Sequence, residues 1–253
     1  MSCEFSLVHY REILAFVAEH YESLPFSHRE RLRGARPRIF MRHDLDHSLA
    51  LAVQMARIEA DAGVRATYFV QLHADSYCAT SLGQVARVRE LVDLGHEVGL
   101  HYDTGYYARY AKDVRRAFQR DLEMLSDVAG APIVSVSRHN PLDSASLGEI
   151  SDLARFDAYS SAFTKDLKYI SDSVMSWREG CVCGFLPKKI DLQVLVHPLW
   201  WCSDGTTMRD RIASCARAEA GELEREIERL AAYYQSCLDQ RPLLDARLRQ
   251  KGG

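Results

Sequence analysis

The chain has 253 residues, of which 47% are hydrophobic and 26% charged, enough to bury a substantial core. Its net charge is -3 and it has no sustained basic run, so we do not expect it to bind nucleic acid. No apolar stretch is long enough for a membrane span, and the N-terminus lacks the basic and apolar regions of an export signal, so we expect a cytoplasmic protein.

The seven cysteines are odd in number and scattered, which agrees with a reducing compartment. Cys181 and Cys183 form the one close pair. This pair lacks the two-residue separation and the second pair that are typical of a structural zinc site, so we do not expect one there.

Helices and strands alternate along the first part of the chain. An apolar repeat predicts an N-terminal helix over about 5–22. Runs rich in β-forming residues predict strands over 38–43, 66–70, 96–101 and 133–137, and amphipathic repeats predict helices over 48–62, 84–94 and 112–128. This alternation favours a largely parallel sheet or an α/β barrel.

After residue 145 the pattern is less regular, and short strands are predicted over 158–162, 167–170 and 192–196. A C-terminal helical segment is predicted over about 206–245, in which Glu222 faces Arg225 and Glu226 faces Arg229. We expect this helix to pack one apolar stripe on the domain. No linker-like stretch divides the chain, so residues 1–253 are interpreted as one domain.

The run Arg42-His43-Asp44-Leu45-Asp46-His47 ends the first predicted strand. Strand alternation places Asp44 and Asp46 on the same face. Two neighbouring acids repel each other, so the pair needs a cation, shares a proton or lies in water. A metal site is the economical interpretation, and an exposed strand end followed by a helix cap is the alternative.

Other polar residues also follow predicted strands. In an α/β barrel such positions face one mouth, so histidines and acids at successive strand ends indicate a common site. The residues in question are His101 and Asp103 after the third strand, Arg138 and His139 after the fourth, and His197 after the strand over 192–196.

Four motifs occur in the order typical of one family, and together they resemble the polysaccharide deacetylases, a set of metal-dependent amidases and esterases on a distorted (β/α) barrel. The resemblance covers roughly residues 38–201. The motifs are His43-Asp44-Leu45-Asp46-His47, Gly95-His96-Glu97-Val98-Gly99-Leu100-His101, Ser137-Arg138-His139-Asn140-Pro141 and Val196-His197-Pro198.

The resemblance implies a role for each matching residue. Asp44 would be the general base, and Asp46 and His101 would be ligands of a divalent metal, for which we expect zinc. His197 would be the general acid, and Asp172 would tune it. A metal held by one carboxylate and two imidazoles leaves positions open for water and the acyl oxygen.

One position departs from the family pattern. Most members carry a second metal histidine four residues after the first, where this chain has Gly105. His139 is the first candidate to complete the site, because it ends a neighbouring strand where the family usually carries an arginine that contacts the base. Asp103 is the second candidate, and His96, ordinarily structural in this family, is the third.

Large side chains near the predicted general acid are candidates for substrate contact. We expect Arg138, Trp177 and Trp200 to contribute to the substrate pocket, with Trp177 as a wall. Adjacent tryptophans such as Trp200 and Trp201 can stack on a sugar ring, although large aromatic residues also occur in cores.

We therefore predict a metal-dependent hydrolase that removes an N-acyl group, acetyl in the simplest case, from an amino sugar or a sugar-linked precursor. The expected cytoplasmic location favours a small-molecule or lipid-linked carbohydrate, as in the biosynthesis of surface polysaccharide such as lipopolysaccharide. One alternative is a non-catalytic protein that binds a carbohydrate or a partner, which Gly105 favours. The other is an enzyme that cleaves a non-sugar amide on the same scaffold.

Overall fold

The computed structural model describes residues 3–139 and 150–251. Asn140 and Pro141, at the end of the third motif, lie outside the described residues. The strands are β1 (Glu22–Ser23), β2 (Arg38–Leu45), β3 (Ala66–Val70), β4 (Glu97–Asp103), β5 (Ser135–His139), β6 (Phe156–Asp157), β7 (Lys168–Ser171) and β8 (Leu192–Val196). The α-helices are α1 (Leu7–His20), α2 (Leu49–Asp61), α3 (Leu82–Asp93), α4 (Thr104–Tyr110), α5 (Val114–Ala129), α6 (Ser161–Thr164), α7 (Pro198–Cys202) and α8 (Met208–Lys251). Short 3-10 helices are η1 (Phe26–His28), η2 (Ser151–Leu153), η3 (Ser173–Met175), η4 (Val182–Gly184) and η5 (Leu186–Lys188).

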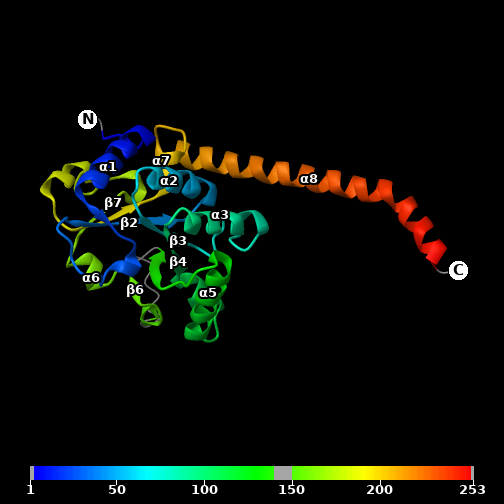
Figure 1. Cartoon of the computed structure of the whole chain (residues 1–253), viewed down its shortest axis with the longest axis horizontal. Helices are drawn as coiled ribbons and strands as arrows, with labels where there is room; N and C mark the ends of the chain where they lie inside the picture. The colour runs from blue at the N-terminus through cyan, green and yellow to red at the C-terminus, as the bar shows by residue number, and fades with distance from the viewer. Residues whose placement is uncertain (1–2, 140–149, 252–253) are drawn as a thin grey trace.

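The strands form one sheet in the order β6-β5-β4-β3-β2-β8-β7, with β1 beside the start of β2 (Figure 1). All pairings among the described strands are parallel. Residues of β5 and β7, near opposite edges of the sheet, line one cavity, so the sheet curls into a partial barrel with β6 and β7 at its edges. The predicted α/β fold with a distorted barrel is confirmed.

Alternation along β2 separates a helix-facing surface from an interior surface. Its odd-numbered residues, such as Met41, pack against residues of the helices. Its even-numbered residues, including Phe40, Arg42 and Asp44, face the inside of the curl, where Phe40 packs with other phenylalanines. Because successive strand residues point to opposite faces, the acids after Phe40 extend the same interior row.

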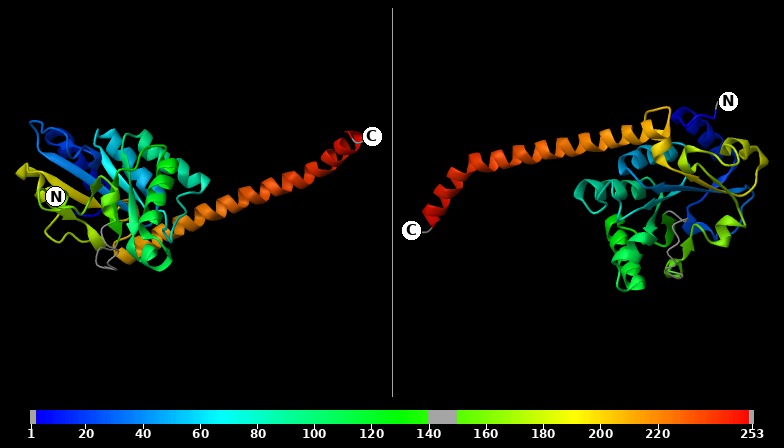
Figure 2. Two further views of the ribbon diagram at one scale, coloured as in Figure 1. Left: turned by 90° about the horizontal axis from the view of Figure 1, so that it is seen from below. Right: turned by 180° about the vertical axis from the view of Figure 1, so that it is seen from behind.

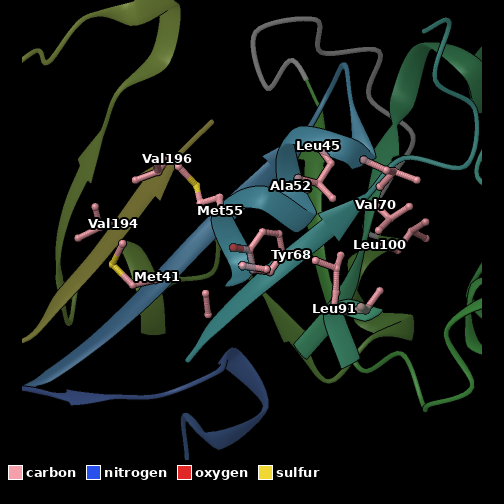
Figure 3. Packing of buried hydrophobic residues seen from close by; sticks show 14 of the residues in the cluster. Met41, Leu45, Ala52, Met55, Tyr68, Val70, Leu91, Leu100, Val194 and Val196 are labelled. Carbon is pink, nitrogen blue, oxygen red and sulfur yellow. The ribbon is translucent and has the colours of Figure 1, made fainter. Parts of the chain in front are cut away.

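The main core lies between the outer face of the sheet and the helices α1, α2, α3 and α5. Figure 3 shows apolar side chains of neighbouring strands directed toward residues of α2 and α3. Burial of these residues removes a continuous apolar surface from water, which is the dominant stabilising contribution to the fold. The labelled residues include Met41, Tyr68, Leu100 and Val194 from strands and Met55 and Leu91 from helices.

A second, aromatic layer fills the interior of the curl below the polar residues. Phe26 stacks on Phe163 with ring centroids 4.2 Å apart and meets Phe40 and Phe69 edge to face. Gly99 makes room for this layer, because a Cβ there would lie 2.6 Å from the Phe69 ring. The layer packs directly against the polar groups, since the Arg42 guanidinium lies 5.8 Å from the centre of the Phe69 ring.

The predicted elements up to β5, and those over 167–170 and 192–196, are found within two residues of their expected ends. The predicted strand over 158–162 is wrong, because β6 ends at Asp157 and α6 begins at Ser161. The Asp157 carboxylate accepts a hydrogen bond from the Tyr159 amide at 2.9 Å, a local turn that ends the strand.

Helix α8 extends far beyond the rest of the fold, as Figures 1 and 2 show. Packing of the whole helix on the domain, as expected from the sequence, is wrong, since every described side chain from Leu223 to Arg241 is exposed. Glu222 pairs with Arg87 of α3 at 2.6 Å instead of with Arg225, whereas Glu226 does pair with Arg229 at 2.7 Å.

The exposed apolar residues Leu223, Ile227, Leu230 and Tyr234 of α8 follow one another at spacings of three and four. This spacing is typical of a helix that packs against another helix. None of the described helices combines the length and the apolar character needed to cross a membrane.

Candidate active site

A cavity of about 640 Å³ opens inside the curl at the carboxyl ends of the strands. Its volume lies in the range typical of sites for small ligands. Charged and aromatic groups from β2, β4, β5 and β7, and from the loops after β2, β6, β7 and β8, surround it, as expected for an active site at this end of an α/β sheet. The lining residues are Asp44, Asp46, His101, Arg138, His139, Tyr159, Tyr169, Ile170, Ser171, Ser173, Val174, Arg178, Glu179, Leu195, His197 and Trp200.

Asp46, His101 and His139 bring one ligand atom each into a common cluster, in which all three atoms lie within 4.8 Å of one another. Asp46 Oδ1 lies 3.1 Å from both His101 Nε2 and His139 Nδ1, and the two ring nitrogens are 3.1 Å apart. One carboxylate and two imidazoles are ordinary ligands of a catalytic divalent metal. The donor set therefore fits a divalent cation, and it leaves coordination positions toward the cavity.

The backbone of β5 selects the tautomer of His101. His101 Nδ1 lies 3.0 Å from the Ser137 carbonyl oxygen, which can only accept, so Nδ1 carries the proton. The lone pair of Nε2 is then directed at Asp46 and His139. Such a contact to the second ring nitrogen is typical of metal-binding histidines.

Electrostatics in the cluster also favour a cation. Burial raises the pKa of Asp46, but the close contacts of its carboxylate with His101 and His139 outweigh this effect and hold the pKa well below its ordinary value. Burial likewise lowers the pKa of His139, and its hydrogen bond to Asp46 reverses the direction and raises it. The ionised carboxylate thus attracts positive charge to this point.

Asp44 lies beside this cluster, with Oδ2 3.9 Å from His101 Nε2. The fully buried Arg42 guanidinium donates to both of its oxygens, at 2.9 and 2.7 Å. Burial raises the pKa of Asp44, but the charge of Arg42 outweighs it and lowers the pKa. Arg42 also donates to Ser137 Oγ at 2.5 Å and Tyr159 OH at 3.0 Å, so its position and that of Asp44 are fixed together.

His197 lies on the other side of the cluster, with Nε2 3.8 Å from Asp46 Oδ2. Its Nδ1 contacts Asp172 Oδ1 at 2.6 Å, and the fully buried Asp172 also accepts from Trp201 Nε1 at 2.9 Å. Burial lowers the pKa of His197, but the charge of Asp172 more than compensates and raises the pKa to about 9. His197 is therefore an imidazolium at neutral pH, with its Nε2 proton toward the cavity.

The other candidates for a third ligand have structural positions. Asp103 is the N-cap of α4, and its Oδ1 accepts from the Gly105 amide at 2.7 Å. His96 is buried, with Nδ1 accepting from the Ala66 amide at 3.2 Å and Nε2 donating to the Ala56 carbonyl at 3.0 Å. Neither side chain belongs to the cluster of ligand atoms.

His43 points away from the cavity, as alternation along the strand predicts, and it is fully buried. Its Nε2 lies 2.8 Å from Glu59 Oε1, and its Nδ1 lies 3.2 Å from the Val196 carbonyl oxygen. Tyr10 and Tyr68 donate to the same carboxylate at 2.5 and 2.6 Å. This polar group ties α1, α2, β2 and β3 together behind the site.

The expected aromatic residues are divided between the cavity and the core. Trp200 lines the cavity, while Trp201 is buried against Tyr10 and Asp172. Trp177 does not line the cavity; its ring stacks on Phe5 at 6.0 Å. Arg138 lines the cavity as expected.

Residues near the cavity that were not expected from the sequence include Arg42, Tyr159 and Tyr169. Arg42 could have been identified, because it shares the interior face of β2 with Asp44. Tyr159 was not recognised because a strand was predicted over 158–162, whereas Tyr159 lies in the turn after β6. Val174, which also lines the cavity, has φ +54° although it is β-branched, a strained conformation that local sequence does not reveal.

Comparison with known proteins yields no matching family model and no matching curated protein. Among solved structures, a CE4 family pseudoenzyme from Bacillus anthracis is 13% identical, with a TM-score of 0.46, over 76% of this chain and 63% of that one. The peptidoglycan deacetylase PdaC from Bacillus subtilis is 11% identical, with a TM-score of 0.45, over 83% and 98%. The chitin deacetylase of the fungal pathogen Colletotrichum lindemuthianum is 15% identical, with a TM-score of 0.43, over 78% and 86%.

The chain spans less than two thirds of the length of the pseudoenzyme. These similar structures are those of the family that the sequence motifs resemble.

Proposed function

We propose that this protein is a metal-dependent hydrolase that removes an N-acyl group from an amino sugar. The observation that carries the proposal is the arrangement of Asp44 and His197 on two sides of the Asp46–His101–His139 cluster, within 4 Å of its ligand atoms. An ionised acid and a protonated histidine can move protons in opposite directions across one cavity, which amide hydrolysis requires.

A divalent cation bound by Asp46, His101 and His139 would polarise the acyl carbonyl and acidify water. Asp44, held ionised by Arg42, accepts a proton from the attacking water. His197, held protonated by Asp172, donates its Nε2 proton to the departing amine nitrogen. Water and the amide thus give a carboxylic acid and an amine, and the two residues exchange their protonation states during the reaction.

The cavity supports a small substrate. Its volume of about 640 Å³ suits a ligand of the size of one or two sugar rings. Trp200, Tyr159 and Tyr169 provide aromatic surface for a ring, and Ser171 and Ser173 provide hydroxyls. We propose an acetylated amino sugar, carried on a nucleotide or a lipid, as in the assembly of surface polysaccharide.

Acetate release tests this proposal. Protein loaded with zinc, or with another divalent metal, would be assayed against nucleotide-linked N-acetyl sugars, a lipid-linked N-acetyl sugar and chitin-like oligomers. We expect acetate release from a nucleotide-linked or lipid-linked N-acetyl sugar, and no release after the metal is removed with a chelator. Acetate release from the oligomers alone would contradict the proposal that the substrate is a single sugar carried on a nucleotide or a lipid. If metal-loaded protein released acetate from none of these compounds, the alternative of a non-catalytic binding protein would be favoured.

A further inference from the structure

Four potential metal ligands meet outside the cavity described above, where the N-terminal segment packs against the loop at η4. Cys3 and His9 come from the N-terminal segment, and Cys181 and Cys183 come from the loop. Cys3 Sγ lies 3.4 Å from Cys183 Sγ, and His9 Nε2 lies 3.3 Å from Cys181 Sγ. All four ligand atoms lie within 4.8 Å of one another.

The distances between these ligand atoms are close to those in a tetrahedral metal site, so small shifts of the side chains would allow them to bind an ion. Zinc bonds of about 2.3 Å to sulfur and about 2.0 Å to nitrogen place tetrahedral ligand atoms roughly 3.5–3.8 Å apart. Three thiols and one imidazole form one of the usual ligand sets of structural zinc sites. The Cys3–Cys183 and His9–Cys181 contacts, at 3.4 and 3.3 Å, need to lengthen only slightly to surround an ion.

The orientation of His9 agrees with this function. Its Nδ1 lies 3.2 Å from Glu12 Oε2, one helical turn further along α1, so Nδ1 donates and Nε2 presents its lone pair to the thiols. A carboxylate on the second ring nitrogen is the usual partner of a metal-binding histidine. The ring of His9 is buried, while Cys3 is exposed, so an ion can enter from that side.

We propose that Cys3, His9, Cys181 and Cys183 bind one zinc ion, as a structural site separate from the catalytic metal. The spacing of Cys181 and Cys183 did not indicate this site, because the fold supplies the other ligands from the opposite end of the chain, 180 residues away in the case of Cys3. A disulfide between Cys3 and Cys183 would use only two of the thiols and leave Cys181 facing His9.

The site would stabilise the surroundings of the catalytic acid. Phe5, between Cys3 and His9, packs against Trp177 and Trp201, and Trp201 donates to the Asp172 carboxylate. Anchoring the N-terminal segment to the loop therefore holds Trp201 against the group that orients His197.

Cobalt substitution tests the proposal. The full chain would be stripped of metal with a chelator under reducing conditions and titrated with Co²⁺ alone. Cobalt bound by thiolates produces a charge-transfer absorption in the near ultraviolet, which the carboxylate and imidazole site cannot produce. We expect this band in the wild type, its loss in Cys181→Ser, and its retention in Cys78→Ser, a control at an exposed cysteine outside the cluster.

Asp46→Ala distinguishes this site from the catalytic one. The variant should keep the thiolate band and bind one equivalent of metal less than the wild type, whatever its effect on acetate release. Absence of the band in folded wild type, or a Cys3–Cys183 disulfide found by mass spectrometry in protein that binds no metal there, would overturn the proposal. The wild-type spectrum decides the question even if Cys181→Ser does not fold.

Discussion

The third donor of the Asp46–His101–His139 cluster comes from β5 rather than from the residue four positions after His101. In the family that the motifs resemble, an arginine that contacts the base usually occupies the position of His139. Here Arg42, two residues before Asp44 on the same face of β2, makes that contact. A histidine thus stands where the family carries its arginine, and β2 supplies the arginine instead, so Gly105 does not by itself imply loss of the metal.

Replacement of His139 and of Asp103, one at a time, should show which of the two binds the metal. We expect His139→Ala to weaken metal binding by more than about 100-fold, because even the partners of metal ligands contribute about 10–100-fold. Asp103→Ala should keep the metal and lose about 1 kcal/mol of unfolding free energy with the N-cap of α4. Metal titration and urea unfolding of both variants measure these effects, and similar metal loss in the two would contradict the ligand assignment.

The pH dependence of turnover should depend on Asp172. The His197 pKa of about 9 means that the general acid is protonated below this pH and is lost as the pH rises through it. Asp172→Asn removes the charge that raises this pKa, so the alkaline limb of the rate profile should move to lower pH. The pH–rate profiles of the wild type and of Asp172→Asn, together with an NMR titration of His197, measure this effect. An unchanged alkaline limb in Asp172→Asn would argue against His197 as the general acid.

At the level of elements, β2 connects the fold to the chemistry. Its helix-facing residues belong to the main core, and its interior residues run from the aromatic layer at Phe40 through Arg42 to the acids. The buried Arg42 guanidinium also lies 4.5 Å from the centre of the Tyr159 ring, a favourable cation–π distance. A single strand thus fixes the position of the base.

Arg42→Met should therefore be costly for stability as well as activity. It leaves the Asp44 carboxylate buried without its partner, and breaking a buried pair in this way costs about 3–5 kcal/mol. Arg57→Met provides a matched control, since Arg57 and Glu90 form a surface pair at 2.6 Å whose loss should cost about 0–1 kcal/mol. Urea unfolding measures both, and an equal cost for the two substitutions would show that Asp44 does not depend on Arg42.

The sequence predicted the strands with strong apolar runs and the convergence of Asp44, Asp46, His101, His139 and His197 at their ends. Both follow from local patterns and from the parallel arrangement of the sheet. The turn after Asp157 is local but was not recognised in the sequence, whereas the packing of Trp177 on Phe5 could not be predicted, because it depends on a contact between distant segments. The same holds for the cysteine cluster, in which Cys3 and Cys183 are 180 residues apart in the sequence.

At the scale of the whole molecule, the described side chains of the long helix α8 contact the rest of the fold at the first turns of the helix. Cys215 is buried against the domain, Glu219 accepts a hydrogen bond from Ser48, and Glu222 pairs with Arg87. Beyond these residues the described side chains of α8 are exposed. The folding of the domain should therefore depend on the beginning of α8 and not on its remainder.

Truncation tests this expectation. A chain that ends at Arg225 keeps the contacts of Cys215, Glu219 and Glu222, so its melting temperature should stay within a few degrees of that of the full chain. A chain that ends at Thr206 loses all three contacts and should melt at a clearly lower temperature. Calorimetry measures both, and unfolding of the longer version would show that the exposed part of α8 supports the domain.

The central claim, metal-dependent hydrolysis with Asp44 as the base, is tested most directly by acetate release from an N-acetylated amino sugar by wild type and Asp44→Asn at equal metal content. The substitution keeps the shape of the side chain and removes its basicity. We predict release by the wild type and a decrease on the order of 10²-fold or more in the variant. Equal rates in the two proteins at equal metal content would contradict the account.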